Sequence, residues 1–259
     1  MKNLDKKTEK LRDMILSTQG AAIAFSGSVA SSVLLKFAHD LLKDKTIAIT
    51  VNSPLFPSYE FQEASTIASE IGVKHSIIGL GKNIVETIKE NTKLRCYYCK
   101  REHLLHIKKE ATTKGFHHIM EGLVYSGNNE NRHKMRALSE FGIVSPFIEA
   151  GFTMQDILEL GRDINLEISE YPQQRCLASR IVHKNPITIE KFRMIESAEM
   201  YLKKLEIFNS KVYLGNGETR LEVNHADIRK VVDNSDRINY RFRKIGIFDL
   251  KVELKDLDN

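Results

Sequence analysis

The chain has 259 residues, with 39 Lys and Arg against 34 Asp and Glu, which gives a formal net charge of +5. Hydrophobic residues make up 42% of the sequence and charged residues 28%, an ordinary globular composition that excludes a disordered or fibrous protein. No apolar run approaches the roughly 18–20 residues needed to cross a bilayer, and the charged N-terminus lacks a signal-peptide core. We therefore expect a cytoplasmic protein with no membrane partner.

The first half of the sequence predicts strands that alternate with helices. Apolar runs at 21–25 and 46–51 are typical of strands buried on both faces, and 75–80 and 117–122 predict two further strands. The stretches between them have helical spacing, which predicts helices at 4–18, 29–42, 58–71, 83–91 and 97–113. This alternation predicts an α/β fold with a Rossmann-like parallel sheet and helices on both of its faces.

The pattern changes after about residue 150. Helices are predicted at 154–164 and 189–205, and a Gly-Asn-Gly-Glu turn predicts a hairpin between strands at 211–214 and 219–223. A helical stretch at 225–246 and an alternating strand at 248–254, with one solvated face, complete the chain. We therefore predict two domains, residues 1–168 and a smaller α+β domain over residues 169–259.

Small residues follow the first predicted strand and open the next helix: Ser26, Gly27, Ser28, Ser31 and Ser32. Ligands of an open parallel sheet bind at the carboxyl ends of its strands, and a helix N-terminus favours an anion. Serine hydroxyls add hydrogen-bond donors. The segment therefore predicts a phosphate cradle, although the same residues also suit a tight strand-to-helix turn without a ligand.

Three cysteines form the second candidate site. Cys96 and Cys99 make a C-x-x-C pair at the start of a predicted helix, and Cys176 lies far along the chain in a polar stretch. An odd number of cysteines in a reducing compartment argues against a disulfide framework. Three thiolates suit a [4Fe–4S] cluster with one open iron, whereas zinc would need a fourth ligand such as His103 or His183. Three unrelated buried thiols are the remaining alternative.

Several motifs in this order resemble a known family. Residues 24–32 resemble the SGGxDS loop of the PP-loop ATP pyrophosphatases, whose fold is of the adenine nucleotide alpha hydrolase type. Further matches follow along the chain at 95–100, 145–153, 176–181, 198–202 and 220–223. Together they resemble the LarE-type ATP-dependent sulfur transferases over about residues 8–254.

The resemblance implies an activity. LarE-type proteins make the thiocarboxylates of the nickel-pincer nucleotide cofactor. ATP with Mg²⁺ would adenylylate a carboxylate of a small nucleotide-like substrate, and sulfide or another sulfur donor would then supply the sulfur. In members with three cysteines, a [4Fe–4S] cluster held here by Cys96, Cys99 and Cys176 would carry that sulfur, with Cys176 as the catalytic position. The resemblance also implies a homo-oligomer.

Site residues follow from the same resemblance. The nucleotide contacts it implies are Ser26, Gly27, Ser28, Ser31, Ser32, Asn52, Ser53, Glu121, Gly122 and Arg132. Arg180, Lys211 and Arg220 would hold the substrate phosphate, although surface cations are an equal interpretation. Two loop positions depart from the family, which has glycine in place of Ser28 and aspartate in place of Ala30. A serine at 28 is expected to clash if the backbone there needs a positive φ or a close approach of the phosphate. Alanine at 30 removes a support for Mg²⁺ or for the hydrogen bonding of the loop.

Two other functions stay open at this point. One is a LarE-like protein that binds an iron–sulfur cluster but has lost or weakened its ATP chemistry, acting as a sulfur carrier or partner subunit. The other is a tRNA thiolase. A tRNA partner is disfavoured, because the charge of +5 is thinly spread and no added RNA-binding domain is visible in the sequence.

Overall fold

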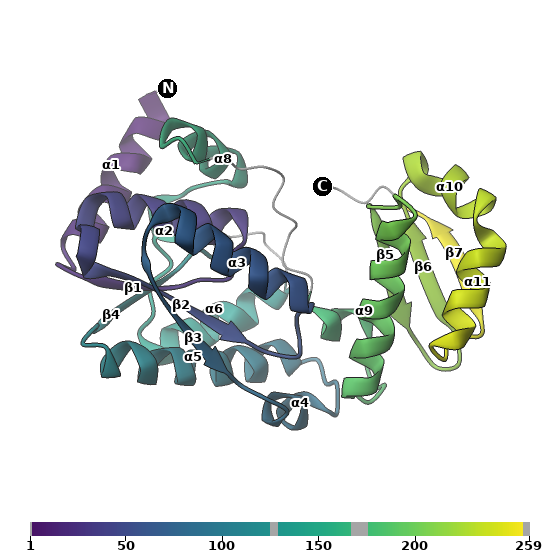
Figure 1. Cartoon of the computed structure of the whole chain (residues 1–259). Coiled ribbons are helices and arrows are strands. Elements are labelled where there is room, and N and C mark those ends of the chain that lie inside the picture. Colours follow the sequence, from purple (N-terminus) through teal and green to yellow (C-terminus); the bar gives the residue numbers. More distant parts are fainter. Residues whose placement is uncertain (1, 125–128, 167–175, 256–259) are drawn as a thin grey trace. The chain divides into compact units, whose positions relative to one another are not determined.

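The computed structural model describes residues 2–124, 129–166 and 176–255, which form two compact units (Figure 1). The first unit comprises residues 1–84 and 94–175, and the second comprises residues 85–93 and 176–259. The predicted boundary between 168 and 169 lies outside the described residues. Among the described residues, no helix combines the length and apolarity needed to span a membrane.

A four-stranded parallel sheet organises the first unit. Its strands are β1 (Ala21–Ala24), β2 (Thr46–Asn52), β3 (Lys74–Gly79) and β4 (His118–Glu121), in the order β3-β2-β1-β4. Residue 21 of β1 pairs with residue 46 of β2 and with residue 118 of β4, so β1 is central. All four carboxyl ends therefore lie at one edge of the sheet, and the loop after β1 leaves from the middle of that edge. The predicted Rossmann-like α/β fold is confirmed.

Helices cover both faces of this sheet (Figure 1). They are α1 (Lys2–Leu16), α2 (Val29–Leu42), α3 (Ser58–Ile71), α5 (Arg95–Thr113), α6 (Asn129–Phe141), α7 (Pro146–Ala150) and α8 (Met154–Asp163), with a 3-10 turn at Lys43–Lys45. The helix α4 (Asn83–Ile88) lies where the chain passes from the first unit to residues 85–93 of the second. One core packs β1 against α1, α2, α3, α7 and α8, and the other packs the sheet against α5 and α6. Strand β1 consists of three alanines and one isoleucine, and all four residues are buried, as expected for a central parallel strand.

The second unit is a small α+β structure. Strands β5 (Ser210–Leu214) and β6 (Thr219–Val223) form the predicted antiparallel hairpin, and β7 (Leu250–Leu254) pairs parallel to β6. The accompanying helices are α9 (Ile189–Lys204), α10 (Ile228–Asp233) and α11 (Ser235–Lys244), with 3-10 turns at Leu177–Arg180 and His225–Asp227. The N-cap predicted for α9 is confirmed, because Thr188 Oγ1 accepts from the Lys191 backbone N–H at 3.3 Å.

Two details of the sequence-based assignment are wrong. It left out α6 and α7, although α6 buries Ala137 and Leu138 in the core that contains α5. It also expected one solvated face on the final strand, whereas Val252 and Leu254 are 45% and 46% exposed alongside an exposed Lys251. An edge strand is covered less completely than the alternation of its side chains suggests.

Candidate functional site

The loop after β1 turns through a glycine that no other residue can replace without strain. Gly27 has φ +78°, and a Cβ there would lie 3.0 Å from the Ala64 Cβ of α3. Ser28 has φ −70° and an extended conformation, so a positive φ, one of the two grounds for expecting a clash here, is absent. The loop therefore keeps its tight turn although its sequence departs from the family pattern.

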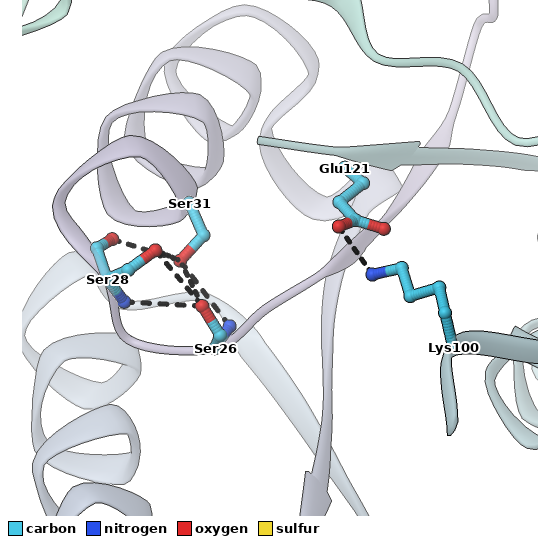
Figure 2. Close-up of polar contacts among 5 residues, drawn as sticks. All are labelled: Ser26, Ser28, Ser31, Lys100 and Glu121. Carbon is cyan, nitrogen blue, oxygen red and sulfur yellow. Dashed lines mark hydrogen bonds and ion pairs between the residues drawn. The ribbon is translucent and has the colours of Figure 1, made fainter. Parts of the chain in front are cut away.

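Three serine hydroxyls of this loop converge on one point (Figure 2). Ser26 Oγ donates to Ser28 Oγ at 3.1 Å, and Ser28 Oγ lies 3.2 Å from Ser31 Oγ. Ser31 Oγ also contacts Ser26 Oγ at 3.2 Å and the Ser28 carbonyl oxygen at 3.0 Å. We call these three side chains the serine cluster. In this arrangement the three hydroxyl protons bond within the loop. Rotated outward, these hydroxyls would join the first N–H groups of α2 as donors to a phosphate group.

A pocket opens beside the serine cluster, at the carboxyl end of β2. Ser26, Asn52 and Ser53, all predicted nucleotide contacts, line it together with seven further residues: Thr50, Val51, Phe56, Pro57, Glu60, Phe61 and Ala64. Of these seven, the sequence analysis placed only Val51, at the end of the second predicted strand, near the nucleotide. Thr50, one of two threonines in the run at 46–51, was an available signal because it lies near the carboxyl end of the predicted strand. The predicted contact Ser32, in contrast, is fully buried within α2.

At the carboxyl end of β4, a second glycine packs so closely against the first turn of α2 that no other residue fits there. A Cβ on Gly122 would lie 2.9 Å from the carbonyl carbon and oxygen of Ala30 and from the Ser31 Cα. Since real Cβ atoms essentially never approach so closely, only glycine lets β4 end against the first turn of α2. The predicted contact Gly122 thus has a packing role that is visible in the structure.

Glu121 precedes this glycine and joins β4 to α5. Its Oε1 accepts a hydrogen bond from Lys100 Nζ, and the two side chains are only 14% and 18% exposed (Figure 2). Its Oε2 is buried and has no hydrogen-bond partner among the described residues. A desolvated carboxylate oxygen of this kind is a fit for a divalent cation. The predicted contact Arg132 lies on α6 with its side chain exposed.

Two of the three cysteines lie on the first turns of α5. Cys96 and Lys100 are four residues apart and share a helix face, and Cys99 adjoins Lys100. Because Lys100 reaches the carboxyl end of β4, the C-x-x-C turn lies at the same edge of the sheet as the serine cluster.

Cys176 belongs to the second unit, directly before a 3-10 turn, and its carbonyl oxygen accepts from the Ser179 hydroxyl at 2.6 Å. All three cysteines are partly buried thiols. Taken unit by unit, the described residues contain no group of three His, Cys, Asp or Glu side chains placed to hold a metal ion. The three-cysteine site spans both units and stays a prediction.

The two histidines considered as further ligands have different surroundings. Burial, followed by the charges of Lys100 and His106, lowers the pKa of His103 to about 3, and its Nε2 is enclosed without a hydrogen-bond partner among the described residues. His183 Nδ1 instead lies 3.1 Å from the Asn91 carbonyl oxygen. His103 is therefore neutral at physiological pH, and His183 already has a backbone contact.

In the second unit, two of the three predicted substrate cations meet at a tyrosine. The guanidinium carbons of Arg180 and Arg220 lie 5.3 Å and 4.9 Å from the centroid of the Tyr213 ring. Burial is the main cause that raises the pKa of Tyr213. The sequence analysis missed this tyrosine, which lies in register opposite Arg220 in the β5–β6 hairpin.

Carboxylates already accompany these cations. The buried Arg180 donates from Nε to Glu199 Oε1 at 3.2 Å, and Arg220 lies 3.1 Å from Glu222 Oε1. Lys211 pairs in register with Glu222 across the hairpin. The structure thus brings Arg180 and Arg220 together with acidic partners, an arrangement that holds the arginines in fixed positions.

The fold and the loop define a Rossmann-like α/β protein with a serine cluster beside a pocket at the carboxyl edge of its sheet. No family model matches the chain. It is 28% identical over 247 residues to the pyridinium-3,5-bisthiocarboxylic acid mononucleotide synthase of Lactiplantibacillus plantarum, covering 95% of this chain and 90% of the relative. The resemblance to the LarE-type family is therefore confirmed over nearly the whole chain.

Two uncharacterised proteins are similar over comparable lengths. One, from Synechocystis, is 28% identical, and the aligned region covers 89% of this chain and 86% of that relative. The other, from Methanocaldococcus jannaschii, is 25% identical, and the aligned region covers 90% of this chain and 88% of that relative. The similarity thus extends through both compact units in each case.

Proposed function

We propose that this protein is an ATP-dependent sulfur transferase that converts a carboxylate of a small pyridinium-type mononucleotide to a thiocarboxylate. The proposal follows the activity in the name of the Lactiplantibacillus plantarum relative. It adds ATP as the activating substrate and a [4Fe–4S] cluster as the sulfur-carrying group. The product would enter nickel-pincer cofactor synthesis.

One observation carries the proposal: the hydrogen bond from Lys100 to Glu121. Lys100 adjoins Cys99 on α5, while Glu121 adjoins the glycine that packs on the first turn of α2. The C-x-x-C turn and the anion cradle therefore lie at the same edge of one sheet. Sulfur delivery to an activated carboxylate requires such proximity, because the adenylate must meet the sulfur before water does.

The residues of the first unit suit the activation step. The serine cluster would bind the phosphates of ATP, and the pocket beside it, lined by Asn52 and Ser53, would hold the adenine. The unpaired Oε2 of Glu121 would support Mg²⁺ in place of the carboxylate missing at Ala30. Lys100 would offset the negative charge that gathers there when nucleotide binds.

The residues of the second unit suit substrate recognition and sulfur delivery. Arg180 and Arg220, held at Tyr213, would bind the phosphate of the substrate mononucleotide. Cys96, Cys99 and Cys176 offer thiolate ligands, and Cys96 and Cys99 sit on one helix turn with lysine beside them. A [4Fe–4S] cluster held by them would supply an open iron that binds hydrosulfide.

A second function is favoured by one observation in the loop. Position 30, in the first turn of α2, is an alanine that is only 6% exposed, where the family has an aspartate. A protein with this loop would still bind the cluster but act as a sulfur carrier or partner subunit without turning over ATP.

The test is a single anaerobic reaction. The reconstituted protein is mixed with ATP, Mg²⁺, sulfide and a pyridinium dicarboxylic acid mononucleotide, and AMP and the substrate mass are followed. We expect AMP to form together with the mass increase of oxygen replaced by sulfur, and both to depend on ATP. A Cys176→Ala control should form AMP without the mass increase. Full iron content with no ATP binding by calorimetry would instead establish the second function.

A further inference from the structure

Thr50 places a hydroxyl in the buried interior of the sheet. It is 5% exposed on β2, between Ile49 and Val51. A buried hydroxyl needs a hydrogen-bond partner, and Thr50 Oγ1 donates to the carbonyl oxygen of Phe25 at 2.9 Å. Phe25 is the residue between the end of β1 and Ser26 of the serine cluster.

His75 of β3 contacts the same hydroxyl. Its Nε2 lies 2.7 Å from Thr50 Oγ1. A threonine hydroxyl has one proton, and here that proton goes to a carbonyl, which can only accept. His75 must therefore donate from Nε2. Burial lowers the pKa of His75, so the neutral ring carries its proton on Nε2 at physiological pH.

The two side chains form a relay across three strands that ends at the loop. The Phe25 N–H donates to the Ile49 carbonyl at 2.9 Å, so both polar groups of this peptide are fixed against β2. The next residue supplies a hydroxyl of the serine cluster, and Gly27 then takes its positive φ. The direction of the Phe25 carbonyl thus sets where the loop begins its turn.

We propose that His75 and Thr50 are positioning residues that hold the Phe25 carbonyl and thereby keep the serine cluster in the geometry that binds phosphate. The proposal rests on the proposed function for its ligand, ATP. Thr50 lines the pocket, yet its hydroxyl proton is committed to Phe25. It therefore shapes the site and does not donate to the nucleotide.

The chain offers conservative variants and a matched control. Thr50→Val and His75→Leu remove the relay, whereas Thr50→Ser keeps the hydroxyl and His75→Gln keeps a donor near the Nε2 position. Thr46→Val is the control: Thr46 is also a buried threonine on β2, 1% exposed, and donates to the Ala38 carbonyl at 3.3 Å, away from the loop.

Calorimetry with MgATP gives the first readout. Thr50→Val and His75→Leu should each raise Kd about tenfold, the change that corresponds to one buried hydrogen bond, and the double variant should be no weaker than either single one. Thr50→Ser and His75→Gln should recover most of the affinity. Thr46→Val should lower the melting temperature but leave Kd unchanged.

A second readout needs no nucleotide. Nitrogen-15 NMR of the unliganded protein should show the Nε2–H tautomer of His75, and hydrogen exchange at residues 26–31 should accelerate in Thr50→Val but not in Thr46→Val. Unchanged loop exchange in Thr50→Val, or an Nδ1–H tautomer, would overturn the proposal. If the wild-type protein binds no ATP while loop exchange responds as expected, the proposed function fails and the relay remains.

Discussion

At the carboxyl edge of the sheet, close packing restricts two positions to glycine. Gly27 and Gly122 fit because each meets another part of the chain where a Cβ would lie: Gly27 meets Ala64 of α3, and Gly122 meets Ala30 and Ser31 of α2. Sequence alone predicts that small residues here make a turn. It does not predict which of them contacts which helix, because Gly122 and Ala30 are distant in the chain.

Gly122→Ala adds one methyl group and so tests how closely Gly122 packs against α2. We expect a loss of about 1–3 kcal/mol in the free energy of unfolding, because the new Cβ lies 2.9 Å from backbone atoms that cannot move aside. MgATP affinity should fall with it, since the displaced atoms belong to the first turn of α2. Urea unfolding and calorimetry measure the two effects.

Gly79→Ala is the matched control, at the carboxyl end of β3. A Cβ at Gly79 meets nothing within 4 Å, so stability should change by no more than about 0.5 kcal/mol. Equal losses in the two variants would show that the packing of Gly122 on α2 has no special importance.

The residue types of the candidate site were predictable, but their partners were not. Ser26, Asn52 and Ser53 line one pocket because they lie at or just after the carboxyl ends of the adjacent parallel strands β1 and β2. Arg180 looks like a surface cation in the sequence, yet it is buried against Glu199, which lies on a later helix. Side-chain pairing across such separations is set by tertiary packing, and a single sequence does not encode it in a local pattern.

At the scale of elements, α5 links the candidate cysteine ligands to the sheet. Lys100 is its anchor, and removing one member of a poorly exposed ion pair leaves the other charge uncompensated. We expect Lys100→Met to lower the free energy of unfolding by about 1–3 kcal/mol and to weaken MgATP binding. Adding Glu121→Gln should recover part of the stability but not the affinity.

Lys89→Met provides the comparison, because Lys89 and Glu86 form an exposed pair with side chains 54% and 73% exposed. Its effect on stability should stay within about 0.5 kcal/mol. Matching effects of Lys89→Met and Lys100→Met in urea unfolding would argue against a link between α5 and β4 through Lys100.

The start of α8 gives a pH prediction. Burial acts to raise the pKa of Asp156, but hydrogen bonds from Lys7 and Thr153 outweigh it and lower the pKa below 3.8. The ionised carboxylate therefore stabilises the fold above the unfolded pKa, and this stabilisation is lost as pH falls through the lower folded pKa. Asp156→Asn should destabilise the protein by about 0.5–1 kcal/mol at pH 7, and by less below about pH 4.

Urea unfolding across this pH range measures the difference between wild type and variant. Asp163→Asn supplies the control variant, because the exposed Asp163 lies at the other end of α8, away from the capping box of Thr153. A difference for Asp156→Asn that stayed constant down to pH 3 would contradict the assigned pKa direction.

Element prediction succeeded where one sequence period dominates. The buried strands and the helices between them were found because wholly apolar runs and helical spacing are strong local signals. The helix α6 was missed because its buried face depends on packing against α5, which lies earlier in the chain. The edge strand β7 was over-interpreted, since alternation does not reveal how much neighbouring structure covers it.

At the scale of the whole molecule, the residues of the proposed function are divided between the two compact units. The serine cluster, Cys96 and Cys99 belong to the first unit, whereas Cys176 and the arginine pair at Tyr213 belong to the second. The family resemblance extends over both units, with similarity covering 95% of the chain for one relative. The central claim is that cysteines from both units bind one [4Fe–4S] cluster.

Iron content after anaerobic reconstitution tests that claim most directly. It is measured per chain in the wild type and in Cys96→Ala, Cys99→Ala and Cys176→Ala, with matching melting temperatures of the apo-proteins as the folding control. The account predicts about four irons per wild-type chain and loss of most of that iron in every single variant. Full iron content in Cys176→Ala would contradict it.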